Sequence, residues 1–325
     1  MKRIVTFAII FVVIGEIFIR LDMLIKPLEG NKIVKITTKL EETREYNLVK
    51  THNVDFSKDV LRIMVLGDSY IHGGGIKFKD NVSQKLKSML IKEKSFQYKE
   101  VLVLDVSRSS SNSLDNNLTY FSFIDQFKPQ IVILGYNIND TEGNLNKLMD
   151  EMPSDSKEKD RQFSVSKIYK IAYKSEFIRF WLHGAHNKLK ANGFVIPQTS
   201  FDLNLKNYYQ DRAAWRQSKV LLKEMIEHSC ANNIKLIVYK FPEMNLINHM
   251  HLFDEADQAI ETFFSGFPSL VFIDGNKDFA NEPSSEYVLS KYDGHPNEKA
   301  HEKVAMVLFE KLDVITDNNS SYVCH

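Results

Sequence analysis

From residue 61 onward, the chain alternates short apolar runs with longer amphipathic segments. Short runs rich in β-branched residues are typical of buried strands, and apolar positions that recur at helical spacing are typical of amphipathic helices. The predicted strands are residues 62–66, 101–106, 130–134, 235–241 and 270–274. Helices are predicted near residues 81–93, 112–127, 210–231, 252–265 and 297–312. This alternation predicts an α/β fold of parallel βαβ units, in which helices cover both faces of the sheet.

The alternation is interrupted once, between the third and the fourth predicted strand. Residues 135–234 separate these strands, whereas a βαβ crossover needs only about thirty residues. We therefore predict a helical insertion at about residues 141–205, where a charged run at 155–161 precedes an aromatic stretch. The insertion is either a helical subdomain with a small core of its own, or a lid or substrate platform over the strand ends, since long insertions in compact domains are often functional.

The N-terminus carries a further apolar run, from residue 4 to about residue 25. Within it, Glu16 and Arg20 are spaced for a helical i,i+4 pair, which permits a membrane-spanning helix. No small-x-small cleavage site follows, so residues 1–25 are predicted to be an uncleaved transmembrane signal anchor. The alternative is an amphipathic or buried helix. The polar residues 26–60 are predicted to form a stem, and basic residues on both sides of the anchor leave its orientation open.

Composition and charge exclude some classes of function. Lys and Arg together number 42, as do Asp and Glu, so the formal net charge is zero and gives no reason to expect a nucleic acid partner. The hydrophobic content of 43% is that of a globular protein. The two cysteines, Cys230 and Cys324, have no metal-ligand spacing and neither demand nor exclude a disulfide.

The first motif with chemistry is Gly67-Asp68-Ser69, directly after the first predicted strand. Turns at the carboxyl edge of a parallel sheet are where α/β enzymes place their ligands. A serine in such a turn can project its hydroxyl into a cleft, while backbone amides of the turn stabilise an oxyanion. The alternative is a serine that only caps a helix.

The second motif is Asp293-Gly294-His295-Pro296-Asn297, before the last predicted helix. A histidine in a loop can act as a general base if a carboxylate fixes its tautomer. Asp293 is suited to this, because residues two apart in extended backbone point to the same side. The alternative is an Asp-Gly turn with an incidental histidine. His301, on the following helix, is expected to be a surface or core residue.

The third motif is the segment from Gly135 to Asp140, at the end of the third predicted strand. It contains Asn137 and Asn139, and a side-chain amide aimed into a cleft can donate to an oxyanion without bringing a charge. Turn chemistry at a strand end is the alternative, because Asn and Asp are common there.

In this order along the chain, the three motifs resemble those of the SGNH (GDSL-like) hydrolase family. The resemblance runs through residues 61–312, within a domain predicted at residues 61–315. It implies a flavodoxin-like three-layer α/β/α sandwich with a five-stranded parallel sheet. Because SGNH hydrolases need neither a metal nor an organic cofactor, none is expected here.

The resemblance also implies a role for each matching residue. Ser69 would attack an ester, His295 would be its general base, and Asp293 would orient the histidine. Asn139 matches the asparagine that contributes to the oxyanion hole, with Asn137 as a substitute. The Ser69 amide would contribute to the same hole.

The chain departs from the family pattern in two places. The family's second block usually supplies the amide of a glycine to the oxyanion hole, and here Arg108 or Ser109 stands at about that place. Because every residue except proline has this N–H, the hole can survive the change. The second departure is the single residue between Asp293 and His295, a spacing that resembles membrane-associated relatives which acetylate exported polysaccharides.

Other catalytic classes lack their motifs. The run from His72 to Gly75 resembles the oxyanion loop of lipases with the α/β-hydrolase fold, but no Gly-x-Ser-x-Gly elbow accompanies it. No phosphate-binding glycine motif is present. His249, His251 and Asp254 could bind a metal, but no matching ligand spacing occurs elsewhere.

The sequence therefore predicts a serine esterase or O-acyltransferase that acts on acyl groups, above all acetyl groups, of a cell-envelope glycan or lipid. The resemblance to anchored relatives implies a catalytic domain on the periplasmic or extracellular side, with the membrane as a partner through the anchor. The alternative is a non-catalytic envelope protein that uses the same cleft to bind a glycan or a partner protein.

Overall fold

A computed structural model of the chain describes residues 43–93, 98–141, 209, 213–290 and 293–317. The predicted anchor at 1–25 and almost all of the predicted insertion at 141–205 lie outside these described residues. None of the described helices is both long and apolar enough to cross a membrane.

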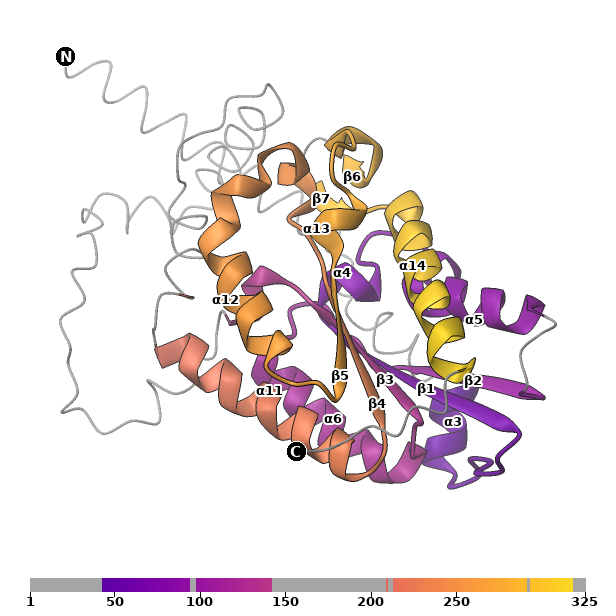
Figure 1. The fold of residues 1–325 in the computed structure, drawn as a ribbon. Coiled ribbons are helices and arrows are strands. Elements are labelled where there is room, and N and C mark those ends of the chain that lie inside the picture. The colour runs from indigo at the N-terminus through magenta and orange to yellow at the C-terminus, as the bar shows by residue number, and fades with distance from the viewer. Residues whose placement is uncertain (1–42, 94–97, 142–208, 210–212, 291–292, 318–325) are drawn as a thin grey trace, which may run out of the picture. The chain divides into compact units, whose positions relative to one another are not determined.

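The centre of the fold is a sheet of five parallel strands (Figure 1), as predicted. Its strands are β1 (Val60–Gly67), β2 (Glu100–Asp105), β3 (Ile131–Tyr136), β4 (Lys235–Lys240) and β5 (Leu270–Asp274). Their order in the sheet is β2-β1-β3-β4-β5, and all four pairings are parallel. The order reverses between β1 and β3, and ligands of such sheets bind outside the carboxyl ends of the strands at this switch point.

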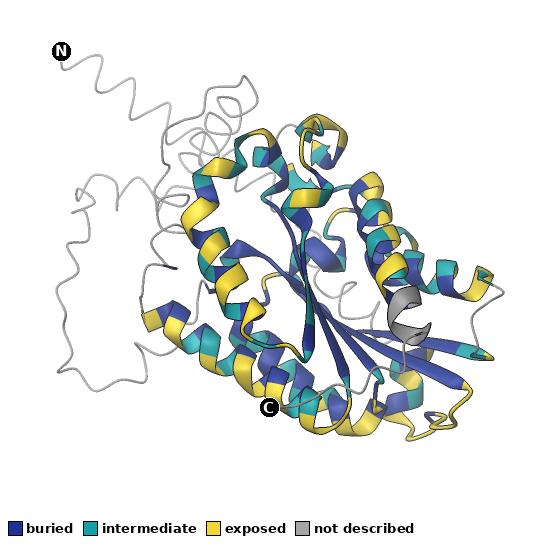
Figure 2. Ribbon diagram, in the orientation of Figure 1, coloured by how far each residue is buried: buried dark blue, intermediate teal, exposed yellow. Residues whose placement is uncertain are grey.

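Helices cover both faces of the sheet, which makes three layers. On one face lie α6 (Ser113–Phe127), α11 (Ala213–Ala231) and α12 (Asp254–Ser265), and on the other lie α5 (Val82–Lys92) and α14 (Glu298–Asp317). Neighbouring residues of a strand serve different faces: Met64 packs in the first core and Val65 in the second. All eight residues of β1 are therefore buried (Figure 2). Burial on both faces of the sheet explains why the strands are continuous apolar runs in the sequence.

The last part of the predicted stem differs from expectation, because it packs against the sheet domain. Residues Arg44–Lys50 form the helix α3, whose first turn is capped by the Thr43 hydroxyl. Val49 and Val54 are buried in the first core, and Glu45 pairs with Lys87 of α5. Over residues 44–60 the chain is thus part of the folded domain rather than a free stem.

Short elements gather at the carboxyl edge of the sheet. After β1 come α4 (Ser69–His72) and η1 (Phe78–Asp80), and after β3 comes η2 (Ile138–Thr141). After β4 comes η3 (Met244–Phe253), and after β5 come α13 (Gly275–Asp278) and η4 (Ser284–Glu286). A two-stranded antiparallel ribbon of β6 (Val288–Ser290) and β7 (Asp293–Pro296) completes this edge. These elements carry all three sequence motifs.

Candidate active site

The turn after β1 places Ser69 at the start of α4. Asp68 is the N-cap of this helix, and its carboxylate accepts a 2.8 Å hydrogen bond from the Tyr70 amide. A short polar side chain at this position satisfies an amide that the helix itself leaves without a partner. The capping role that the sequence left open for Ser69 therefore belongs to Asp68, and the Ser69 hydroxyl is available for other contacts.

Two glycines let α4 sit close above the strand ends. Gly67 and Gly135 are paired in the register of β1 and β3, and Gly67 has φ +139°. A Cβ atom on Gly67 would lie 2.5 Å from the Gly135 carbonyl oxygen, and one on Gly135 would lie 2.6 Å from Cβ of Ile71. Both contacts are far inside van der Waals distance, so larger residues would displace α4 and with it Ser69.

The structure brings Ser69, His295 and Asp293 together as a hydrogen-bonded chain. The Ser69 Oγ lies 3.0 Å from Nε2 of His295, and the His295 Nδ1 lies 2.6 Å from Oδ1 of Asp293. An ionised carboxylate only accepts, so the Nδ1 atom carries the ring proton and Nε2 is left as an acceptor for the serine proton. This is the arrangement in which a histidine can act as a base toward a serine.

The backbone of His295 also donates to Oδ1 of Asp293, at 3.1 Å. The same carboxylate oxygen thus receives the backbone and the ring N–H groups, so two hydrogen bonds hold it beside the imidazole. The side chains of His295 and Asp293 are 40% and 49% exposed, so this pair lies at the surface, unlike a buried triad.

Contacts at both ends of β7 hold the ribbon in place. The Asn297 side-chain amide donates to the carbonyl oxygens of Glu286, at 2.8 Å, and Val288, at 3.1 Å. Gly294 packs against Asn245 of η3 so closely that a Cβ atom on the glycine would lie 2.9 Å from Cγ of Asn245. The position of His295 therefore depends on tertiary contacts of a segment that the sequence predicted only as a loop.

Tyr70 is a site residue that the sequence analysis missed. Its ring centroid lies 5.5 Å from that of His295, and its hydroxyl donates a 3.2 Å hydrogen bond to the Glu243 carboxylate. Burial, followed by the charge of Glu243, raises the pKa of Tyr70 well above its ordinary value, so the phenol stays protonated. The buried Tyr70 ring packs against the partly exposed imidazole of His295. Its position directly after the serine was the only available signal.

Asp68 is a buried carboxyl group beside the nucleophile, with 2% of its surface exposed. Burial raises its pKa to about 6, while hydrogen bonds from the Tyr70 amide and the Asn139 and Ser69 side chains and the charge of His295 oppose the shift. Above this pH the group is ionised and anchors the side chain of Asn139 next to Ser69.

The two asparagines of the third motif differ in placement. Asn139 is partly exposed, and its side chain donates to Asp68. Asn137 is fully buried, and its Oδ1 accepts a 3.0 Å hydrogen bond from the backbone N–H of Asn139. Within the described part of the chain, the Asn137 Nδ2 has no hydrogen-bond partner. Asn139 therefore lies beside the nucleophile, whereas Asn137 supports the loop from beneath.

The structure contradicts the assignment of the Arg108 amide to the oxyanion hole. This N–H donates to the Gly67 carbonyl at 3.0 Å, because the segment after β2 continues the hydrogen bonding along β1. The guanidinium points elsewhere: it is 61% exposed and pairs with Asp115 at 3.4 Å. Neither the amide nor the cation of Arg108 is directed at Ser69.

Ser109, the other residue that the sequence left open for this position, lies next to the nucleophile. A Cβ atom built on Gly74 would be 3.6 Å from the Ser109 Oγ and 3.6 Å from the Ser69 Cβ. The turn after α4 therefore holds the side chains of the two serines on either side of one glycine, and Ser109 stays a candidate for the second-block donor.

Several other histidines of the described residues make contacts outside the catalytic chain. His301 is fully buried, its Nδ1 accepts the Val82 amide at 3.1 Å, and burial lowers its pKa to about 3. The rings of His249 and His251 meet edge to face, with 6.2 Å between their centroids. Among the described residues, no group of three suitable side chains could hold a metal ion. His72 contacts the Ser107 hydroxyl at 3.3 Å.

Comparison with known proteins gives similarity at the level of structure only. No family model matches the sequence, and no curated protein does. Among solved structures, the chain is similar to TesA, with 11% identity, 78% of this chain and 99% of that chain covered, and a TM-score of 0.45. A G-D-S-L family protein from Desulfitobacterium hafniense DCB-2 gives 13% identity, coverage of 77% and 98%, and a TM-score of 0.41.

An acetylxylan esterase from Geobacillus stearothermophilus, solved as a catalytic variant, gives 10% identity, coverage of 82% of this chain and 97% of that chain, and a TM-score of 0.44. GDSL-type proteins are thus among the structures to which the chain is similar, in line with the resemblance of its motifs. With TM-scores below 0.5, the similarity carries no argument about chemistry, which rests on the geometry of the site itself.

Proposed function

We propose that this chain is a serine esterase or O-acyltransferase that works through an acyl-enzyme on Ser69. The observation that supports this most strongly is the unbroken Ser69–His295–Asp293 chain, with 3.0 Å between the serine hydroxyl and the histidine. A nucleophile, its base and the group that orients the base are the parts that acyl transfer requires.

In the first step, His295 takes the proton of the Ser69 hydroxyl on Nε2 while Oγ attacks the carbonyl carbon of the ester. Asp293 stabilises the imidazolium that forms, without taking its proton. The protonated ring then gives the proton to the leaving alcohol, and the acyl group stays on Oγ. Water completes hydrolysis, or a hydroxyl of an acceptor completes transfer, with His295 again as the base.

The negative charge that develops on the carbonyl oxygen needs donors near Ser69. We assign this role to the Ser69 amide, in the first turn of α4, to the Asn139 side chain and to the Ser109 amide. One such donor is worth roughly 2.7–4 kcal/mol of transition-state stabilisation where it has been removed by mutation.

We further propose that the ester is an acyl group, above all acetyl, on a cell-envelope glycan or lipid. This follows from the one-residue spacing of Asp293 and His295 and from the apolar N-terminus. The predicted anchor would hold the domain at a membrane, on the periplasmic or extracellular side. The alternative of a cleft that only binds is less well supported, because a binding protein has no need of a serine within hydrogen-bond reach of an oriented histidine.

Hydrolysis of p-nitrophenyl acetate by the full-length chain tests the proposal. We expect turnover that Ser69→Ala and His295→Ala both abolish, while Ser122→Ala, on the exposed surface of α6, leaves it unchanged. Turnover that survives in Ser69→Ala, or a folded wild-type protein without turnover, would contradict the proposal.

A further inference from the structure

A buried carboxylate at the end of β2 uses its full hydrogen-bonding capacity. It belongs to Asp105, the last residue of the strand. Its Oδ1 accepts the backbone N–H of Ser107 at 3.0 Å and also the Ser107 hydroxyl. Its Oδ2 accepts the Asn81 side-chain amide at 2.9 Å and the Ser83 hydroxyl at 2.6 Å. A carboxylate has about four acceptor positions, so Asp105 joins the segment after β2 firmly to the start of α5.

Two of these partners continue to His72, the last residue of α4. The Ser107 hydroxyl gives its single proton to Asp105, so it accepts a hydrogen bond from the His72 Nδ1, 3.3 Å away. The Asn81 side-chain amide, which has two hydrogens, also donates to the backbone carbonyl of His72 at 3.3 Å. Asp105 therefore reaches the end of α4 by two routes, one to the imidazole ring and one to the main chain.

The end of α4 matters because the helix is a single turn that begins with Ser69. A helix of one turn is not stable in isolation, so tertiary contacts determine its orientation. The backbone N–H groups of Gly73 and Gly74, directly after His72, donate to the Ser69 carbonyl at 3.1 and 3.2 Å. A tilt at His72 is therefore passed to Ser69, whose Oγ has to stay within reach of the His295 Nε2.

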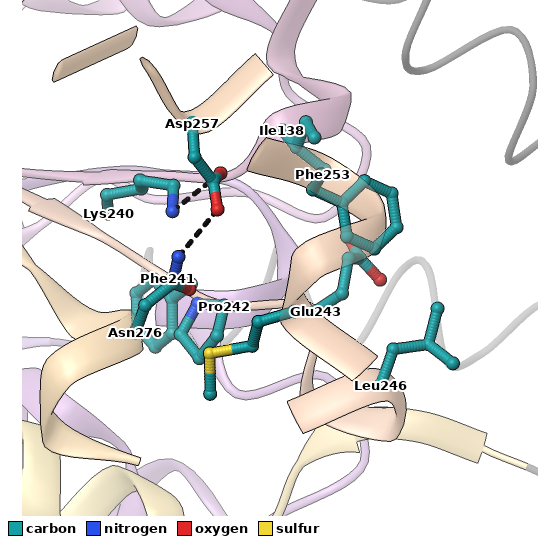
Figure 3. A pocket seen from close by; sticks show the side chains of 10 residues that line it. Ile138, Lys240, Phe241, Pro242, Glu243, Leu246, Phe253, Asp257 and Asn276 are labelled. Carbon is teal, nitrogen blue, oxygen red and sulfur yellow. Dashed lines mark hydrogen bonds and ion pairs between the residues drawn. The ribbon is translucent and has the colours of Figure 1, made fainter. Parts of the chain in front are cut away.

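A second polar group at the carboxyl edge of the sheet joins other elements (Figure 3). Lys240 and Asn276 donate to the two carboxylate oxygens of Asp257, at 2.7 and 2.6 Å, on the wall of a pocket. These bonds connect β4, α12 and α13. The loss of a hydrogen bond in this group should therefore affect stability without moving α4.

We propose that Asp105 is a positioning residue for acyl transfer, which acts through Ser107 and His72 to hold α4 and with it the Ser69 hydroxyl. The inference rests on the proposed function, since it concerns the reaction at Ser69. It gives a role to His72, which stood out in the sequence only as the start of a glycine run. The reaction is sensitive to such support, because a misplacement of about 1 Å can cost roughly 10²-fold in rate.

A pair of substitutions at His72 separates positioning from bulk. His72→Asn keeps an N–H donor as many bonds from Cβ as Nδ1 is, so it can preserve the bond to Ser107. His72→Leu has a side chain of similar size without a donor. The half-buried position of His72 makes both variants suitable for folding.

A second pair separates positioning from the loss of a buried hydrogen bond. Ser107→Ala and Ser83→Ala each remove one hydroxyl bond to Asp105, but only Ser107 also contacts His72. Asn276→Ala, which loses the bond to Asp257, serves as the control away from α4. Urea unfolding of each variant shows how much stability it has lost.

The measured quantity is kcat/KM for p-nitrophenyl acetate, which reports the attack by Ser69. We expect His72→Leu and Ser107→Ala to lose at least about fivefold, and His72→Asn, Ser83→Ala and Asn276→Ala to stay within about twofold of wild type. An active His72→Leu, or equal losses within either pair, would overturn the positioning role while leaving the esterase in place. A folded wild-type protein without turnover would instead refute the proposed function, and the role of Asp105 with it.

Discussion

The exposed position of Asp293 leads to a specific prediction for its replacement by asparagine. In the structure, Oδ1 of Asp293 accepts both the backbone N–H and the ring N–H of His295. The Oδ1 of an asparagine can accept the same two bonds, and the backbone N–H selects that orientation of the amide. Asp293→Asn should therefore keep the tautomer of His295 and remove only the negative charge.

The magnitude follows from how well water screens that charge. Two unit charges about 4 Å apart interact by about 1 kcal/mol in water and about 4 kcal/mol near a protein surface. With 49% of the Asp293 side chain exposed, the lower half of this range applies. We expect kcat to fall about ten- to hundredfold, less than the roughly 10⁴-fold loss in a triad whose aspartate is buried.

Steady-state hydrolysis of p-nitrophenyl acetate measures the effect, with Asp293→Ala as the matched variant. Alanine removes the acceptor as well as the charge, so it should lose about tenfold more than asparagine. If asparagine lost as much as alanine, or about 10⁴-fold, then the backbone N–H would not be fixing the carboxyl group as the structure has it.

Three further predictions concern the surroundings of Ser69. Gly135→Ala should lower the free energy of unfolding by about 1–3 kcal/mol in urea titrations, because its Cβ would clash with Ile71. Gly74→Ala should change the free energy of unfolding little, because its Cβ meets only ordinary contacts at 3.6 Å. Equal effects of the two substitutions would contradict this packing. The pKa of Asp68 is raised to about 6 from 3.8, so between these pH values the folded state binds more protons than the unfolded state, and stability contributed by this group falls as pH rises. Wild type should thus lose up to roughly 3 kcal/mol of unfolding free energy relative to Asp68→Asn between pH 4 and pH 6, and a parallel pair of stability curves would refute the shift. Tyr70→Phe, which keeps the ring beside His295 but loses the bond to Glu243, should lower kcat/KM only a few-fold, and Tyr70→Leu should lower it more; identical losses in the two variants would argue against a supporting role for the ring.

The parts of the fold that the sequence predicted well are those in which burial determines the pattern. Each strand of the sheet is covered on both faces, so its apolar run is continuous and easy to identify. Asn81 and Asn112 mark the starts of α5 and α6, since each side chain accepts an amide of the first turn. The predicted helix bounds are accordingly close to those observed.

The ribbon of β6 and β7 was not predicted, because its residues carry no alternating pattern. Its second strand is Asp293–Pro296, in which only Pro296 is buried. Contacts with η3 and the Asn297 side chain hold it in place, and neither is visible in a local pattern. The sequence could name Asp293 and His295 from their motif, but the segment that positions them is defined by tertiary structure.

The choice of oxyanion donors also depends on tertiary structure, which the sequence alone does not reveal. Counting residues after β2 made Arg108 and Ser109 equal candidates for the backbone N–H donor to the oxyanion, since each has such a group. The Arg108 amide donates to the Gly67 carbonyl oxygen, a tertiary hydrogen bond that counting residues cannot reveal. The sequence also left open whether Cys230 forms a disulfide. In the structure, Cys230 is disulfide-bonded.

The most direct test of the account is whether Ser69 is an activated nucleophile. The full-length chain would be treated with a fluorophosphonate probe, and the labelled peptide would be identified by mass spectrometry. The account predicts a single modified residue, Ser69, with labelling lost in Ser69→Ala and His295→Ala and retained in Ser122→Ala. A folded wild-type protein that does not label, or labelling that persists at full rate in His295→Ala, would contradict it.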